Sequence, residues 1–260
     1  MLIVILSQNI IFFNMFIFNM FKRSFFVSIL TISDLHLALG IDKPMDIFGD
    51  GWKNYMQRLK ENWNLTVSQD DTVVIGGDIS WATYLDEAYK DFEYLENLNG
   101  RKIILKGNHD YWWESITKLE GYVQKNGFCS ISFLHNKAIS VENKAICGTR
   151  GWIDKSNDNF KEDDLKIYNR ELMRLDMSLS EADKFACDEK IAFLHYPPVT
   201  KNLEINEDYL DILKKHSVKR CFYGHIHSKA AKKAVEGEFD GIEFKLVSAD
   251  YMGFMPYKLS

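Results

Sequence analysis

The sequence has little cysteine and proline, and it has no extended run of basic residues. Its 260 residues include four cysteines and four prolines, and no two cysteines form a C-x-x-C pair. This spacing argues against a cysteine zinc site or a disulfide framework, and free thiols are typical of a reducing compartment, so we expect a cytoplasmic protein. The formal net charge of −5 gives no broad basic surface for nucleic acid.

Linkers and internal repeats are also absent from the sequence. No stretch rich in proline, serine or glycine divides the chain, and no segment repeats another. Hydrophobic residues make up 46% and charged residues 27% of the sequence, which is ordinary for a globular protein and argues against disorder. We therefore expect a single domain over residues 25–260.

Residues 1–24 form an apolar N-terminal extension that differs from the rest of the chain. The first 21 residues carry no charge and are long enough to span a bilayer. They lack the basic start and the small-residue cleavage site of a signal peptide, and five polar residues interrupt them. Two interpretations stay open: the natural start is Met15 or Met20, or the extension anchors the protein to a membrane.

After the extension, short apolar runs alternate with segments of helical periodicity. The helical segments are 52–63, 84–98, 163–179 and 208–216. Such alternation is typical of β-α-β units, whose helices cover the faces of a sheet, so we expect an α/β fold. The strands after residue 130 lie closer together, and we expect some of them to be antiparallel. The predicted strands are 26–33, 72–77, 102–107, 130–134, 144–148, 190–195, 220–224 and 242–248.

Polar residues follow five of these predicted strands. In open α/β sheets, functional groups collect where strands end. Taken singly, each residue also fits a helix cap, a turn or a core histidine, but five such strand ends together indicate one site. His135 and His216 lie outside this pattern, and we interpret them as structural or surface residues. The candidate site residues are Asp34, His36, Asp78, Asn108, His109, His195, His225 and His227.

The chemistry of this set suits a pair of metal ions. Carboxylate, amide and imidazole groups without thiolate favour manganese, iron or zinc over copper or an iron–sulfur cluster. On extended backbone, residues two apart share a face, so Asp34 and His36 should project to the same side, as should His225 and His227. The two oxygens of Asp78 can bridge two ions, and metals ~3.5–4 Å apart can activate a water and clamp a phosphoryl group.

In this order, the blocks D-x-H, G-D, G-N-H-D, H and G-H-x-H resemble the calcineurin-like metallophosphoesterase superfamily. The segments GDISWA, KGNHDYWW and HYPP are similar to those of a bacterial branch of this superfamily whose members are described as predicted phosphohydrolases. The resemblance implies a four-layer α/β/β/α sandwich with the site at one edge of the paired sheets. It also implies two divalent metal ions, with manganese favoured over iron or zinc, and hydrolysis of a phosphate ester by a hydroxide that bridges them.

The resemblance further implies a role for each matching residue. In the G-N-H-D block, His109 faces the phosphate without binding metal, and Asp110 orients it as a second catalytic residue. The metal ligands form two sets that share one aspartate: Asp34, His36, Asp78 and His227 for one metal, and Asp78, Asn108, His195 and His225 for the other.

Two departures from the superfamily pattern argue against two of its classes, the protein Ser/Thr phosphatases and the purple acid phosphatases. Protein Ser/Thr phosphatases carry G-D-x-x-D-R-G, whereas this chain has GDISWAT and lacks the second aspartate and the arginine. Purple acid phosphatases have a tyrosine ligand where this chain has Trp81, so no tyrosinate-to-iron colour is expected.

The substrate contacts are less well defined by the sequence. Trp81, Trp112 and Trp113 follow ligand-bearing turns and either form an aromatic wall for a base or acyl group or cover the core. Arg150 either binds a phosphate bidentately or forms a salt bridge. We expect a small phosphorylated metabolite or nucleotide as the substrate. The alternatives are a phosphodiesterase or nuclease and a non-catalytic scaffold of the same fold.

Overall fold

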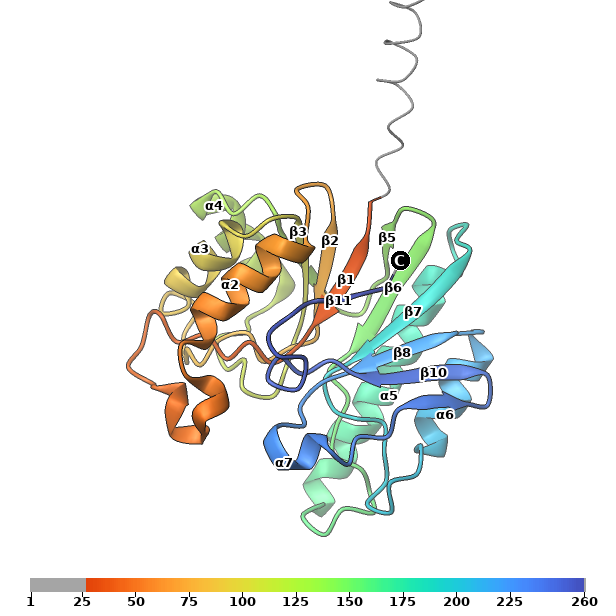
Figure 1. Cartoon of the computed structure of the whole chain (residues 1–260). Helices are drawn as coiled ribbons and strands as arrows, with labels where there is room; N and C mark the ends of the chain where they lie inside the picture. Colours follow the sequence, from red (N-terminus) through yellow and green to blue (C-terminus); the bar gives the residue numbers. More distant parts are fainter. Residues whose placement is uncertain (1–26, 260) are drawn as a thin grey trace, which may run out of the picture.

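The computed structural model describes residues 27–259, and the predicted N-terminal extension lies outside these residues. The described chain forms two β-sheets that lie face to face, with helices on the outer face of each (Figure 1). Between residues 27 and 259, none of the helices combines the length and the apolar character that crossing a bilayer requires.

The first sheet has the strand order β11-β1-β2-β3-β4. Strands β1 to β4 run parallel, and β11 pairs antiparallel with β1 at one edge. Parallel pairing brings the carboxyl ends of β1, β2 and β3 to the same edge of the sheet. The bounds are β1 Ile29–Ile32, β2 Thr72–Ile75, β3 Arg101–Leu105, β4 Ile131–Leu134 and β11 Tyr257–Lys258.

The second sheet has the order β5-β6-β7-β8-β10-β9. Its four central strands run parallel, while β5 and β9 pair antiparallel at the two edges. The expected mixture of directions after residue 130 is therefore confirmed. The bounds are β5 Ile139–Val141, β6 Lys144–Thr149, β7 Glu189–Leu194, β8 Arg220–Tyr223, β9 Gly237–Phe239 and β10 Ile242–Leu246.

Helices cover both sheets on their outer faces. α2 (Tyr55–Thr66), α3 (Tyr89–Glu96) and α4 (Ile116–Asn126) lie over the first sheet, and α5 (Glu162–Ala182) and α6 (Glu207–Lys215) lie over the second (Figure 1). All the predicted helices are present, and α4 is an addition to them. Three short helices stand in loops: η1 (Met45–Phe48), η2 (Asp50–Trp52) and α7 (Ser228–Ala231).

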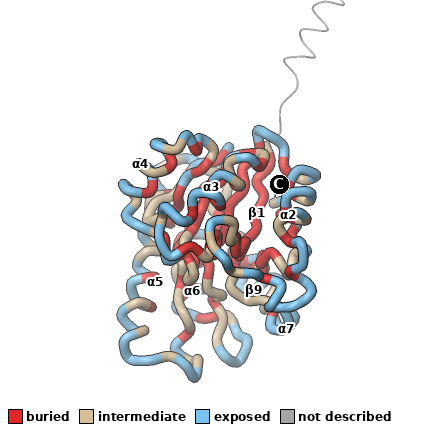
Figure 2. The backbone as a smooth tube through the Cα atoms, turned by 90° about the vertical axis from the view of Figure 1, so that its left-hand side faces the viewer, coloured by how far each residue is buried: buried red, intermediate tan, exposed pale blue. Residues whose placement is uncertain are grey.

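Each central strand supplies side chains to two different apolar cores, because successive residues point to opposite faces of a sheet. In β1, Leu30 packs in the core beneath the first group of helices, whereas Ile29 packs in the core between the sheets. In β7, Leu194 packs beneath α5 and α6, whereas Phe193 faces the first sheet. Buried residues accordingly run along the strands in Figure 2. Three cores separate four layers, as the α/β/β/α expectation requires.

Truncating a side chain in the core between the sheets should destabilise the whole domain. Phe193 is 1% exposed and stacks on Phe222, with ring centroids 5.5 Å apart. We expect Phe193→Ala to lower the free energy of unfolding by about 3–5 kcal/mol, because it leaves a cavity between the sheets. Phe239→Ala, at a residue that is 38% exposed, should change it by less than about 1 kcal/mol. Urea denaturation followed by circular dichroism measures both, and equal losses would contradict the layer assignment.

Candidate metal centre

The candidate site lies where the carboxyl ends of strands from both sheets meet. Beyond β1, Ser33 donates its amide hydrogen to the Val247 carbonyl at 2.8 Å, and Ala249 donates to the Ser33 carbonyl at 2.8 Å. These bonds join the end of the first sheet to the end of β10 in the second. The loops that follow β1, β2, β3, β7 and β8 therefore project their side chains into one region.

Four of the predicted ligands have left-handed backbone conformations. Their φ angles are 63° at Asp34, 47° at His36, 53° at Asp78 and 71° at His225. The expectation that Asp34 and His36 project to the same side because they lie on extended backbone is therefore wrong, since the turn itself directs both side chains inward. The same expectation for His225 and His227 is also wrong, because His225 is left-handed and the two residues lie in different ligand groups. Such conformations cost roughly 1–3 kcal/mol each in non-glycine residues and are concentrated at functional sites.

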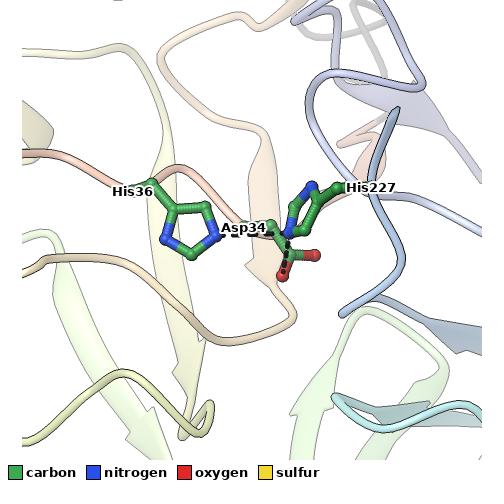
Figure 3. Close-up of side chains that lie close together, drawn as sticks. All are labelled: Asp34, His36 and His227. Carbon is green, nitrogen blue, oxygen red and sulfur yellow. Dashed lines mark hydrogen bonds and ion pairs between the residues drawn. The ribbon is translucent and has the colours of Figure 1, made fainter. Parts of the chain in front are cut away.

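Asp34, His36 and His227 form the first group of possible metal ligands. The Nε2 atoms of His36 and His227 lie 3.2 Å apart, and His227 Nε2 lies 3.3 Å from Asp34 Oδ1. The two rings and the carboxylate point toward one another, although they come from loops 191 residues apart in sequence (Figure 3). This group would offer a divalent ion two nitrogen ligands and one oxygen ligand.

Asp78, His195 and His225 form the second group. His195 Nε2 lies 2.7 Å from Asn108 Oδ1 and 3.5 Å from Asp78 Oδ2, so the asparagine lies beside this group. The His225 ring packs against His195, with centroids 5.2 Å apart, and against Tyr196 at 4.2 Å.

One carboxylate oxygen lies between the two groups. Asp78 Oδ2 is 3.5 Å from His195 Nε2 in the second group and 3.8 Å from His36 Nε2 in the first. This position is what a carboxylate ligand shared by two ions would need.

Hydrogen bonds at the opposite ring nitrogens orient two of these histidines. The His195 Nδ1 atom lies 3.1 Å from the Gly76 carbonyl, and His227 Nδ1 lies 2.9 Å from Asp250 Oδ1. With Nδ1 donating, Nε2 is left to face the ligand groups, an arrangement common among metal-binding histidines. Sequence reasoning missed Asp250, although it follows the end of β10 and the same strand-end rule would have found it.

Burial and mutual repulsion make the two aspartates unfavourable neighbours without a cation. Burial, together with Asp110 and Asp34, raises the pKa of Asp78 well above its ordinary value of 3.8. For Asp34, burial acts in the same direction, but His227, His195 and His36 outweigh it and lower the pKa. A divalent cation between these carboxylates would offset their repulsion.

The histidine pKa values agree with a cation-binding site. Burial lowers the pKa of His195 to about 3 and that of His225 to about 4, which leaves both rings neutral and able to ligate metal. For His227, burial is outweighed by Asp34 and Asp250, which raise the pKa to about 10. The surroundings of His227 therefore favour positive charge beside Asp34. The donor set and the electrostatics both fit a bound metal.

The two loops that carry Asp34 and Asp78 pack against glycines at close range. A Cβ atom on Gly107 would overlap Asp78 at both its backbone nitrogen and Oδ1. A Cβ on Gly224 would overlap Ser33 Oγ and Asp34 Oδ2. These glycines permit backbone to lie directly against the carboxylates, which no larger residue would allow.

Asp110 does not orient His109, contrary to what the resemblance implied. Its carboxylate accepts hydrogen bonds from the backbone amides of Asp78, Ile79 and Gly107 at 2.7–2.9 Å and from the Trp112 indole at 3.0 Å. The His109 Nδ1 atom has no hydrogen-bond partner. Through these hydrogen bonds, Asp110 instead links the turn after β3 to the turn after β2, and so positions Asp78.

His109 faces a pocket beside the first group, which it lines together with His36 and His227. Its backbone amide donates to Asp78 Oδ1 at 2.8 Å, and its ring packs on Trp81, with centroids 4.4 Å apart. Because Nδ1 is buried, Nε2 is the nitrogen that can meet a ligand. Burial and the nearby Lys43 lower the pKa of His109.

The three tryptophans have different positions. Trp112 is 1% exposed and packs in the core against Phe92, so it covers the core and does not line the pocket, contrary to its assignment as a substrate contact. Trp113 packs partly buried against Phe133. Trp81, in contrast, lines the pocket beside His36 and His109.

The remaining sequence expectations concern Arg150, two histidines and the cysteines. Arg150 lies 3.5 Å from buried Glu171 and covers the Trp152 ring, so it forms the salt bridge that was one of its two expected roles. Arg150 lines a different cavity from the one that His109 lines. His216 is buried and structural, because its Nε2 lies 2.9 Å from Asp176 Oδ1 and its Nδ1 lies 3.0 Å from Asp183 Oδ2. His135 is half-buried beside Trp113. All four cysteines lie in the described chain and are unpaired.

Comparisons with known proteins agree with this geometry. The sequence model of the calcineurin-like phosphoesterase family matches residues 27–229. No curated protein matches the chain. Solved structures with a similar fold include a protein of unknown function from Aquifex aeolicus, which is 18% identical, covers 89% of this chain and 95% of its own, and has a TM-score of 0.50. A phosphopantetheinyl hydrolase from Mycobacterium tuberculosis is 12% identical over the same shares of the two chains, with a TM-score of 0.52.

The chain belongs to the calcineurin-like phosphoesterase family. It is a metal-dependent phosphoric ester hydrolase, with two groups of possible metal ligands at the shared edge of its sheets.

The close approach at Gly107 gives a test of the site that leaves the core intact. We expect Gly107→Ala to displace the Asp78 carboxylate, and so to lower both bound metal and activity by at least about tenfold, since a small misplacement of a site group can cost ~10²-fold. Gly121→Ala is the matched control, because nothing lies within 4 Å of its added Cβ and alanine favours the α4 helix. Elemental analysis after manganese loading measures the metal, and full metal content in Gly107→Ala would contradict the argument.

Proposed function

We propose that the enzyme hydrolyses a small phosphorylated molecule at a centre of two metal ions. The position of Asp78 Oδ2, within 4 Å of an imidazole nitrogen from each ligand group, is the observation that supports two ions with a shared carboxylate. Under this proposal the first ion takes Asp34, His36, Asp78 and His227, and the second takes Asp78, Asn108, His195 and His225.

Manganese is the proposed metal, with iron and zinc as alternatives. The donors are carboxylate, amide and imidazole groups, and the described part of the chain places no cysteine sulfur in either group. Harder oxygen and nitrogen donors of this kind suit manganese, whereas thiolates would favour zinc or an iron–sulfur cluster.

The bound metals would supply Lewis-acid stabilisation of the phosphate and a water of lowered pKa. In the reaction, an oxygen atom from water bonds to phosphorus while the bond from phosphorus to the ester oxygen breaks. Protonated His109 gives the hydrogen on Nε2 to the departing ester oxygen, which leaves as an alcohol. The proton that the attacking water loses passes to the solvent, from which His109 is protonated again. A phosphate dianion beside His109 favours the protonated ring and so opposes the lowering of its pKa by burial and Lys43.

The shared ligand should affect both metal sites at once. Asp78→Asn removes the negative charge between the groups while keeping the side-chain volume, so we expect both ions to bind more weakly and activity to fall by at least about 10²-fold, the scale at which loss of a stabilising group is felt. Asp158→Asn, at a side chain that is 87% exposed in the loop before α5, is the control and should leave both unchanged. Elemental analysis with a manganese titration checks the result. Loss of one ion with full retention of the other would count against a bridging role.

His109 and His195 should differ in their dependence on the leaving group. General acid catalysis contributes typically ~10²–10⁴-fold, and it matters most for a poor leaving group such as an alkoxide. We therefore expect His109→Ala to keep its metal and to lose far more activity on an alkyl phosphate than on a nitrophenyl phosphate. His195→Ala should lose metal and fail on both esters.

The measurement is kcat/KM of manganese-loaded protein on the two esters, paired with metal content. If His109→Ala lost equal activity on both esters, or if it lost metal, His109 would not be the general acid. A parallel screen of phosphate mono- and diesters tests the activity itself. Turnover of diesters alone would favour the phosphodiesterase or nuclease alternative, and no turnover despite two bound metals would favour the scaffold.

A further inference from the structure

A pocket of about 210 Å³ opens directly beside the first ligand group. Its lining includes three histidines of the site, His36, His109 and His227. The rest of the lining, here called the apolar side, consists of apolar residues except for one with a hydroxyl, and its Trp81 ring stacks directly on His36. The apolar residues are Met45, Phe48, Trp52 and Trp81, and the hydroxyl belongs to Ser228.

The apolar side is attached firmly to the protein core. Met45 and Trp52 are 5% and 4% exposed, and the Trp52 ring makes edge contacts with Tyr55 and Phe254. The Trp81 indole N–H donates to Met45 Sδ at 3.0 Å. Phe48 is different, because it lines the pocket and is still 51% exposed. A ligand in the pocket would cover part of this exposed ring.

The pocket is poorly suited to a nucleobase. The Trp81 ring stacks on His36, with centroids 4.8 Å apart, and carries the Lys43 ammonium 3.1 Å from its centroid, so it is not a free stacking surface. A base also brings donors and acceptors that must find partners when buried. Apart from the three histidines, the described residues of the lining offer only two polar side-chain groups, the Ser228 hydroxyl and the Trp52 indole N–H, because the Trp81 indole already donates to Met45.

We propose that this pocket binds an apolar hydrocarbon group joined to the phosphate of the substrate, so that the enzyme prefers alkyl or acyl-bearing phosphate esters to nucleotides. This proposal rests on the proposed function, which places the phosphate of the substrate beside His36, His109 and His227. An apolar protein cavity of ~150 Å³ holds a benzene molecule, so the volume here suits a chain of about six to eight carbons.

Binding of alkylphosphonates, which have no ester bond to hydrolyse, tests the pocket separately from catalysis. Calorimetry on manganese-loaded protein should show Kd falling about fourfold per added methylene from methyl- to hexylphosphonate, equivalent to ~0.8 kcal/mol for each group buried. The series should level off at longer chains, once the pocket is full. A nucleoside phosphonate should bind more weakly than hexylphosphonate.

Phe48→Ala and Ile47→Ala form a matched pair, since both side chains are exposed and adjacent in η1 but Phe48 alone of the two lines the pocket. We expect Phe48→Ala to weaken hexylphosphonate binding about fivefold, in line with the apolar area it loses, and Ile47→Ala to leave it unchanged. Equal effects of the two variants would overturn the assignment of Phe48.

The two proposals fail in different ways. A Kd that does not depend on chain length, or tighter binding of the nucleoside phosphonate, overturns the hydrocarbon pocket even when phosphate esters are hydrolysed. Chain-length-dependent binding without hydrolysis of any ester in the screen, hexyl phosphate included, sustains the pocket and overturns the proposed function.

Discussion

Burial of two carboxylates beside each other is the constraint on which the site depends. Asp34 and Asp78 are 0% and 1% exposed, and each follows a central strand of the first sheet. Isolated buried charges are expensive, so a protein keeps them only where partners or metal ions offset the charge. The partner of Asp34 is His227 from the second sheet, 3.3 Å away and favoured in its charged form, whereas the neutral His195, 3.5 Å from Asp78, does not offset the charge of that carboxylate. The two sheets are therefore linked by electrostatics at this edge as well as by the apolar core between them.

The backbone around these carboxylates is held in a strained but well-supported form. Left-handed conformations at Asp34, His36 and Asp78 direct the side chains inward. Asp110 opposes relaxation of the turn that holds Asp78, because its carboxylate takes amide hydrogens from both neighbouring turns. The cost of this geometry is met by burial elsewhere in the structure, and the result is a set of possible metal ligands whose side chains already point toward one another.

The site combines two kinds of surface that come from different parts of the chain. The polar groups come from loops at the ends of buried strands. The apolar side of the pocket comes largely from residues 45–52, an excursion between β1 and α2 that contains η1 and η2. Under the two proposals above, catalytic chemistry and substrate preference depend on separate segments. Changes in the excursion would alter which ester binds without touching the metal ligands, as expected of loops that carry specificity on a rigid scaffold.

The sequence by itself determined the fold class, eight strands of the two sheets and the set of polar residues at the strand ends, but not the short edge strands β5, β9 and β11. Apolar runs and their polar ends are local features, so they can be read without knowing how the chain folds. The tertiary structure decided what those residues contact. It placed Asp110 on backbone amides and Trp112 in the core, added Asp250 behind His227, and showed the turn geometry at Asp34. None of these follows from spacing, because a side chain's direction and partners depend on loops that meet across the two sheets, up to 214 residues apart in sequence.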